Sequence, residues 1–263
     1  MESLSRQEVV HYLKSIANHI EPKPSYYITM SGNASLIQTN FNPPLIFPSE
    51  CHYEIACCGV ETYYSFPNIN ENNNKVQISF DKGVNWILLE IPKGCYEIKA
   101  INTVLRRLIK NQRSDKEDYL CLIPNKNTFQ SVLTLKKLWV NFKGAEGSLR
   151  TVLGFDEKIY RDDNGGRHES EHIVNILRVN SILIHCDVVK FSRRNGIAAP
   201  IIYNFFPNVP PGFKIVDRPR NLIYLPLTLN VISQMSCWLT DQEGKALDMR
   251  GEEVTITFHI KAC

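Results

Sequence analysis

Apolar and polar residues alternate with a period of two near the end of the chain. Val254, Ile256 and Phe258 would share one face of a strand, whereas Thr255 and Thr257 would share the other face, and the pattern continues to residue 261. This alternation predicts a strand of an antiparallel sheet with one face in a core and the other in water.

The same period, or a short apolar run bounded by turn residues, recurs along most of the chain. It predicts further strands over residues 26–30, 52–63, 76–80, 86–91, 119–123, 128–135, 138–142, 176–189, 221–229 and 235–240. Asp241–Gly244 has the composition of a hairpin turn, and Asn42-Pro43-Pro44 that of a loop.

Helical spacing appears twice. Residues 5–20 begin with a capping box at Ser5 and Glu8, carry a stripe of apolar residues, and end before Pro22 and Pro24. This segment could be an arm that docks on a neighbour or a helix packed on its own domain. Residues 96–110 predict a second amphipathic helix with a basic face, for which solvent exposure is favoured over phosphate binding.

Many strands with short turns and no βαβ alternation select a sandwich, jelly roll or barrel. We predict an N-terminal helical arm and Pro-rich linker over 1–24 and one domain over 25–263, with a second lobe starting at about residue 172 as an alternative.

Composition narrows the class of protein. The formal charge of +3 is too small to indicate a specific nucleic-acid partner, and no run approaches the ~20 apolar residues of a membrane span. The first twenty residues lack the apolar core of a signal peptide, so we expect synthesis in the cytoplasm or nucleus. The eight cysteines show no zinc-ribbon spacing, and we expect reduced core thiols, with disulfides in a finished extracellular particle as the alternative.

No catalytic motif is found, so we predict a protein that is not an enzyme and has no catalytic residue, no metal and no cofactor. His168 and His172 have a spacing that could hold a metal on a helix, but their segment is polar and loop-like without a third ligand. His185 and Cys186 are neighbours in a strand, so they point to opposite faces and cannot pair as base and nucleophile.

One aromatic and proline-rich loop suits assembly better than catalysis. Aromatic side chains on a rigid loop are good interface anchors, and the alternative is that the loop caps the open end of its own sandwich. The candidate interface residues are Tyr203, Phe205, Phe206, Pro210, Pro211 and Phe213.

An ordered series of short motifs resembles penton-type minor capsid proteins of Polinton/Maverick elements and adintoviruses. The motifs are Gly32-Asn33, Phe41-Asn42-Pro43-Pro44, Tyr53–Ala56, Thr62–Ile69, Ile91–Ile98, Leu153-Gly154-Phe155, Val174–Ile176, Leu222–Pro226 and Leu239–Gly244 to Arg250–Glu252. They span about residues 26–260 and leave the N-terminal helix outside the match.

The resemblance implies a jelly roll, which agrees with the fold class that the residue pattern predicts, an all-β jelly-roll sandwich with an N-terminal helix and one inserted helix. It also implies a vertex (penton) protein of a virion or a virus-like transposon particle. Its partners would be copies of itself, expected as a homopentamer, and a major capsid protein. The alternative is a jelly-roll module that binds a ligand or carbohydrate.

Overall fold

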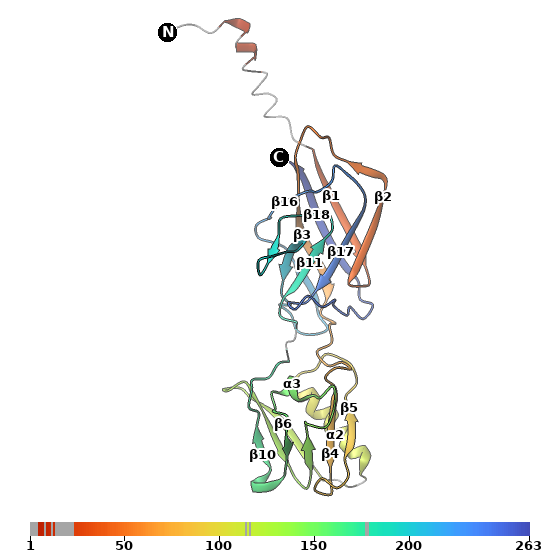
Figure 1. Ribbon diagram of the computed structural model, residues 1–263, viewed down its shortest axis with the longest axis vertical. Coiled ribbons are helices and arrows are strands. Elements are labelled where there is room, and N and C mark those ends of the chain that lie inside the picture. Colours follow the sequence, from red (N-terminus) through yellow and green to blue (C-terminus); the bar gives the residue numbers. More distant parts are fainter. Residues whose placement is uncertain are drawn as a thin grey trace.

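The computed structural model describes residues 5–263 except 8, 12, 14–23, 114, 116, 177 and 178. It is an elongated molecule with two lobes stacked along its long axis (Figure 1). The terminal lobe consists of residues 24–66 and 179–263, and the inserted lobe of residues 67–176. Most of the predicted helix over 5–20 lies outside the described residues, although the described positions between 6 and 13 have helical backbone.

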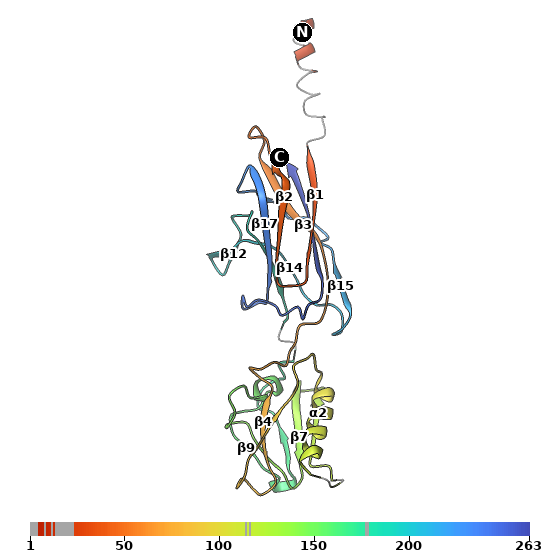
Figure 2. The same ribbon diagram turned by 90° about the vertical axis from the view of Figure 1, so that its right-hand side faces the viewer.

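The terminal lobe is a sandwich of two antiparallel sheets. One sheet has the order β1 (Ser25–Gly32), β18 (Val254–Ala262), β3 (Tyr53–Tyr63) and β15 (Lys214–Asp217), with β16 (Leu225–Pro226) also paired to β3. The other has the order β14 (Ile201–Phe205), β11 (Ile182–Cys186), β17 (Val231–Thr240) and β2 (Leu36–Ile46). A small hairpin of β12 (Arg193–Arg194) and β13 (Ile197–Ala198) projects from its side (Figure 2).

The connections make this sandwich a jelly roll. Leaving out β12, β13 and β16, successive strands alternate between the sheets except for β11 and β14, which pair with each other in one sheet. The first strand pairs with the last, and the second with the second to last. This wrapping of paired strands is the double Greek key of a jelly roll. The predicted fold class, an all-β jelly-roll sandwich with an inserted helix, is therefore confirmed.

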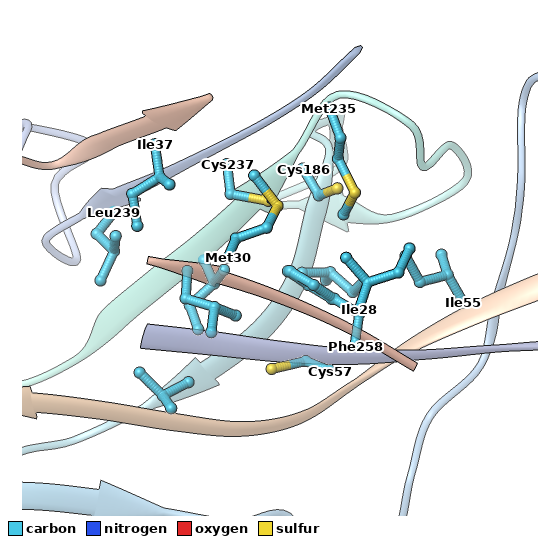
Figure 3. Packing of buried hydrophobic residues seen from close by; sticks show 14 of the residues in the cluster. Ile28, Met30, Ile37, Ile55, Cys57, Cys186, Met235, Cys237, Leu239 and Phe258 are labelled. Carbon is cyan, nitrogen blue, oxygen red and sulfur yellow. The ribbon is translucent and has the colours of Figure 1, made fainter. Parts of the chain in front are cut away.

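The core of the terminal lobe lies between the two sheets (Figure 3). The predicted alternation in β18 is confirmed, because Val254, Ile256, Phe258 and Ile260 are fully buried while the residues between them are half-buried. Cys57, Cys186 and Cys237 are also buried there as free thiols, together with Met30 and Met235.

The inserted lobe has its own core and two small sheets. One sheet orders β5 (Ile87–Glu90), β4 (Lys75–Ser79), β8 (Trp139–Asn141) and β9 (Ile159–Tyr160), and the other orders β10 (Arg167–Glu169), β7 (Gln130–Leu135) and β6 (Leu120–Asn125). Helix α2 (Ile98–Gln112) packs beside β6 with Ile98, Ile101, Leu105 and Ile109 buried, as its amphipathic pattern predicts. The short helix α3 (Arg150–Leu153) and the 3-10 turn Asp163–Gly165 complete this lobe.

The structure has two cores, whereas the sequence favoured one domain over 25–263. The alternative of a second lobe from about residue 172 lies close to the end of the inserted lobe at residue 176, but the terminal lobe also includes residues 24–66. The inserted lobe interrupts the jelly roll between β3 and β11, so both of its connections pass through one junction. At this junction Asn68 Nδ2 donates to the carbonyl oxygens of Tyr96 and Ile176, at 2.7 and 3.1 Å. Across it, Lys93 Nζ forms an ion pair with Asp248 Oδ2 at 2.5 Å.

Strand β2 is another difference from the sequence prediction. The Asn42-Pro43-Pro44 segment lies inside this strand, where the pairing register with β17 shifts by several residues between Asn40 and Leu45. Proline cannot donate a ladder hydrogen bond, and here it occupies an irregular part of an edge strand, where it is tolerated. Among the described residues, no helix is long and apolar enough to cross a membrane.

Candidate assembly surface

The predicted aromatic loop connects the two sheets of the terminal lobe. It leaves the edge strand β14 of one sheet after Phe205 and enters the edge strand β15 of the other sheet at Lys214. The loop therefore lies at one side of the sandwich, and the structure divides its six candidate residues into a buried and an exposed group.

Phe205 and Tyr203 belong to the sandwich itself. Phe205 is 3% exposed and lies in the core. Tyr203 is half-buried against that core, and its hydroxyl donates to Asp217 Oδ2 at 2.5 Å. Burial and this hydrogen bond raise the pKa of Tyr203 above its usual value. These two residues are therefore part of strand β14 and its packing, and Phe205 is not available to a partner.

The remaining candidates are exposed on a well-supported turn. Phe206 is 67% and Phe213 62% exposed, and Pro210 and Pro211 are also exposed. Phe213 N donates to Pro210 O at 3.2 Å, and Gly212 has a φ of 88°, which suits the third position of a type II turn.

Backbone hydrogen bonds hold this turn against β3. Tyr64 N donates to Phe213 O at 2.9 Å, and Gly212 N donates to Tyr64 O at 2.8 Å. The exposed ring of Phe213 therefore starts from fixed backbone, which lowers the entropy lost when a partner covers it.

The sheet that has β14 at one edge has β2 at the other, and this β2 edge also carries apolar surface, which the sequence did not indicate. Leu36, half-exposed, lies directly across from Trp238 in the β2–β17 ladder. The Trp238 ring stacks on His185 with ring centroids 5.0 Å apart and an interplanar angle of 6°. An aromatic row thus runs over the outer face of the sheet toward its β2 edge.

The β12–β13 hairpin is a further exposed element that sequence reasoning missed. Phe191 is 80% and Ile197 74% exposed. Asn195 and Gly196 both have positive φ, and an Asn-Gly pair between two short strands is a strong hairpin signal that could have revealed this element.

The residues considered for metal binding are separated by the fold. His168 lies in the short strand β10 and its Nε2 contacts Arg161 O at 2.5 Å, whereas His172 Nε2 lies 3.1 Å from Asp156 Oδ1. The helix that their spacing would require is not formed. In the described part of the chain, no group of three or more His, Cys, Asp or Glu residues is placed to hold a metal ion.

His185 and Cys186 point to opposite faces of β11, as predicted. Cys186 is in the core, whereas His185 lies on the outer face beside Trp238 and contacts Thr240 Oγ1 through Nε2 at 2.9 Å. Burial, followed by the charge of Arg194, lowers the pKa of His185. The two side chains cannot act together as base and nucleophile.

One hollow of about 550 Å³ lies on the inserted lobe. Its apolar lining comes from Ile98, Pro124, Phe129, Val174 and Ile176, with amide side chains and Lys126 at the rim. Phe129 is exposed and has a φ of 57°, which is unusual for a bulky residue.

Comparison with known proteins supports the fold described above. No family model and no curated protein sequence matches the chain. Among solved structures, it is similar to the crystal structure of the selenomethionine-labelled penton protein of mavirus, with a TM-score of 0.51 and 10% sequence identity. The match covers 91% of this chain and 100% of the mavirus chain, so the chain has a penton-like fold.

Proposed function

We propose that this chain is a structural vertex protein of an icosahedral capsid, which assembles with copies of itself as a pentamer and joins a major capsid protein. The observation that carries the proposal is the fold likeness to a penton protein, which extends over all of that chain and nearly all of this one. On this proposal the chain resides in a virion or virus-like particle, and its activity is self-association rather than catalysis.

A closed ring of identical subunits needs two different surfaces on each subunit, because each contact is head-to-tail. The jelly roll offers such a pair at opposite edges of one sheet. We assign Phe206 and Phe213 to one surface, beyond the β14 edge, and Leu36 with Trp238 to the other, at the β2 edge. Covering these edges would also protect unpaired strands from aggregation.

The test measures particle mass for the purified chain and two variants. Mass photometry of the wild type, alone and with its major capsid protein, should show a species of five times the chain mass. Phe206→Asp with Phe213→Asp should shift the population to monomers, because a charge would be buried without a partner. Ile123→Asp is the matched control, since Ile123 is an exposed apolar residue of the inserted lobe outside both assigned surfaces.

A persistent monomer at high concentration, with no incorporation into capsids, would exclude the proposal. A three-fold mass would instead indicate a trimeric major-capsid or fibre-like arrangement. A pentamer that survives the Phe206/Phe213 double substitution would retain the vertex function but refute the assigned surface.

A further inference from the structure

Three of the eight cysteines are fully buried in the core of the jelly roll, and two of them face each other. Cys186 is the last residue of β11 and Cys237 lies opposite it in the neighbouring strand β17. Both side chains point into the core, beside Met30 and Met235 (Figure 3). The third buried cysteine, Cys57, belongs to β3 in the facing sheet.

The hydrogen-bond pattern defines the geometry of the pair. Asp187 N donates to Ser236 O, so the next residue pair along the ladder is a hydrogen-bonded one. Cys186 N points away from β17, because it donates to Pro200 O. Leu239 N donates to Ser35 O on the β2 side, so Cys237 N, two residues earlier in the same strand, also points toward β2 and away from β11. Cys186 and Cys237 therefore form a non-hydrogen-bonded pair of the antiparallel ladder.

This kind of pair brings side chains closest together. Directly opposed residues at such positions have Cα atoms about 4.5 Å apart, within the range of about 4.4–6.8 Å that a disulfide spans. The Cys237 thiol interacts with Cys186, which together with burial raises the pKa of Cys237, and its Sγ lies 3.8 Å from Met30 Sδ. The Cα separation typical of such a pair therefore suits a disulfide without movement of the strands.

We propose that Cys186 and Cys237 are a latent disulfide that closes under oxidising conditions and ties β11 to β17 inside the jelly roll. The inference does not depend on the capsid function. For a particle that leaves a reducing cell, such a bond would form or persist only outside, where disulfides are stable.

The chemistry is thiol–disulfide exchange with a small disulfide such as oxidised glutathione. One cysteine thiolate attacks the glutathione disulfide, forming a mixed disulfide and releasing one glutathione thiolate, which takes up the lost proton. The second cysteine thiolate attacks the protein sulfur of the mixed disulfide and releases the second glutathione in the same way. Two protein thiols are oxidised and one glutathione disulfide is reduced to two thiols.

Burial controls access to this reaction. Because both thiols are fully buried, exchange requires transient opening of the sandwich or oxidation during folding. The same burial would protect the closed bond from reduction. The experiment therefore includes both a native and a refolding route.

The test first blocks accessible thiols, such as Cys121 and Cys263, with iodoacetamide in the native reduced chain. The chain is then incubated with oxidised glutathione in low urea, and in parallel the untreated chain is refolded with oxidised glutathione. Peptide mapping without reductant should show a Cys186–Cys237 crosslink by both routes. The crosslinked form should melt about 5–10 °C above the reduced form, because the bond closes a loop of about 50 residues.

The matched control is Cys57→Val, which removes the third buried thiol from the facing sheet and should leave the crosslink and its thermal shift intact. Cys186→Val and Cys237→Val should each abolish both. A crosslink from Cys57 to either cysteine, no Cys186–Cys237 peptide by either route, or a crosslinked form that melts below the reduced form would overturn the proposal.

Discussion

At the scale of single residues, Gly166 shows how closely the inserted lobe is packed. Gly166 has a φ of 65°, and a Cβ atom added to it would lie 2.0 Å from the carbonyl oxygen of Leu135. Leu135 N in turn donates to Gly166 O at 2.8 Å. Any side chain at this position must therefore push β7 away and break a backbone contact.

Gly166→Ala is expected to destabilise the chain by about 2–4 kcal/mol, because strain at positive φ adds to a steric clash. Gly165→Ala is the control, since Gly165 also has positive φ but has no atom within 4 Å of the added Cβ. It should cost about 1 kcal/mol. Chemical denaturation of both variants checks the difference, and equal losses would contradict the packing described here.

We expect His185 to make the stability of the jelly roll depend on pH. Its Nε2 contacts the Thr240 hydroxyl, and its Nδ1 is buried without a partner among the described residues. Burial is the larger cause that lowers the pKa of His185, and the positive charge of Arg194 is the second. The unfolded chain thus binds a proton near the ordinary His pKa of 6.5, whereas the folded chain resists protonation.

Below about pH 6.5 the unfolded state therefore binds more protons than the folded state, and stability falls as the pH falls. Above that pH the residue is neutral in both states and contributes no pH dependence. We expect the loss of stability between pH 7.5 and 5.5 to be smaller in His185→Leu than in the wild type, as measured by urea midpoints. A larger loss in the variant would show that the sign is wrong.

At the scale of elements, α2 is held by its apolar stripe. Ile101 is fully buried against the inserted lobe, whereas Arg107 on the same helix is exposed. Ile101→Ala should cost about 2–5 kcal/mol, and Arg107→Ala less than about 0.5 kcal/mol. Hydrogen exchange followed by mass spectrometry should place the loss in residues 67–176, and equal loss in the terminal lobe would contradict separate cores.

Elements were predictable wherever one period dominated the local sequence. Strands β3 and β18 and helix α2 were predicted nearly to their ends, because each buries one continuous face. Strand β2 was missed because Pro43 and Pro44 resemble a loop, and tertiary pairing overrides that local signal. Among the described residues of the long apolar run 176–189, β11 is the one strand, with five residues, because apolar residues there also line the core.

The candidate surface was predictable only in part, for a similar reason. Phe206 and Phe213 stood out as aromatics in a proline-rich loop, and the structure exposes them. Phe205 shares that loop composition but ends a strand, so its direction depends on pairing with β11. Leu36 and Trp238 are 202 positions apart in the numbering, and no local pattern brings them together.

At the scale of the whole molecule, the division into two cores could not be read from the strand pattern. Strand signals continue without change of character through both lobes, which are separated by long-range pairings such as those of β1 and β3 with β18 and of β2 with β17. The Lys93–Asp248 ion pair that crosses the junction is partly exposed. An exposed ion pair of this kind contributes at most about 1 kcal/mol.

We therefore expect the jelly roll to tolerate removal of the inserted lobe. A chain in which residues 69–175 are replaced by a short glycine–serine linker should retain a cooperative thermal transition and a strand-type circular dichroism spectrum. The reason is that the terminal core takes no buried residue from that segment. An unfolded or aggregated product would show that the lobes stabilise each other.

The position of β18 between β1 and β3 also has a consequence for the order of events during synthesis. The core of the inserted lobe is encoded between residues 69 and 160, so it can close while the ribosome is still translating downstream codons. The jelly roll cannot close until residues 254–262 have emerged from the ribosome, because β18 is the strand that pairs with both β1 and β3. The nascent chain would thus carry a finished inserted lobe between two unfinished halves of the sandwich.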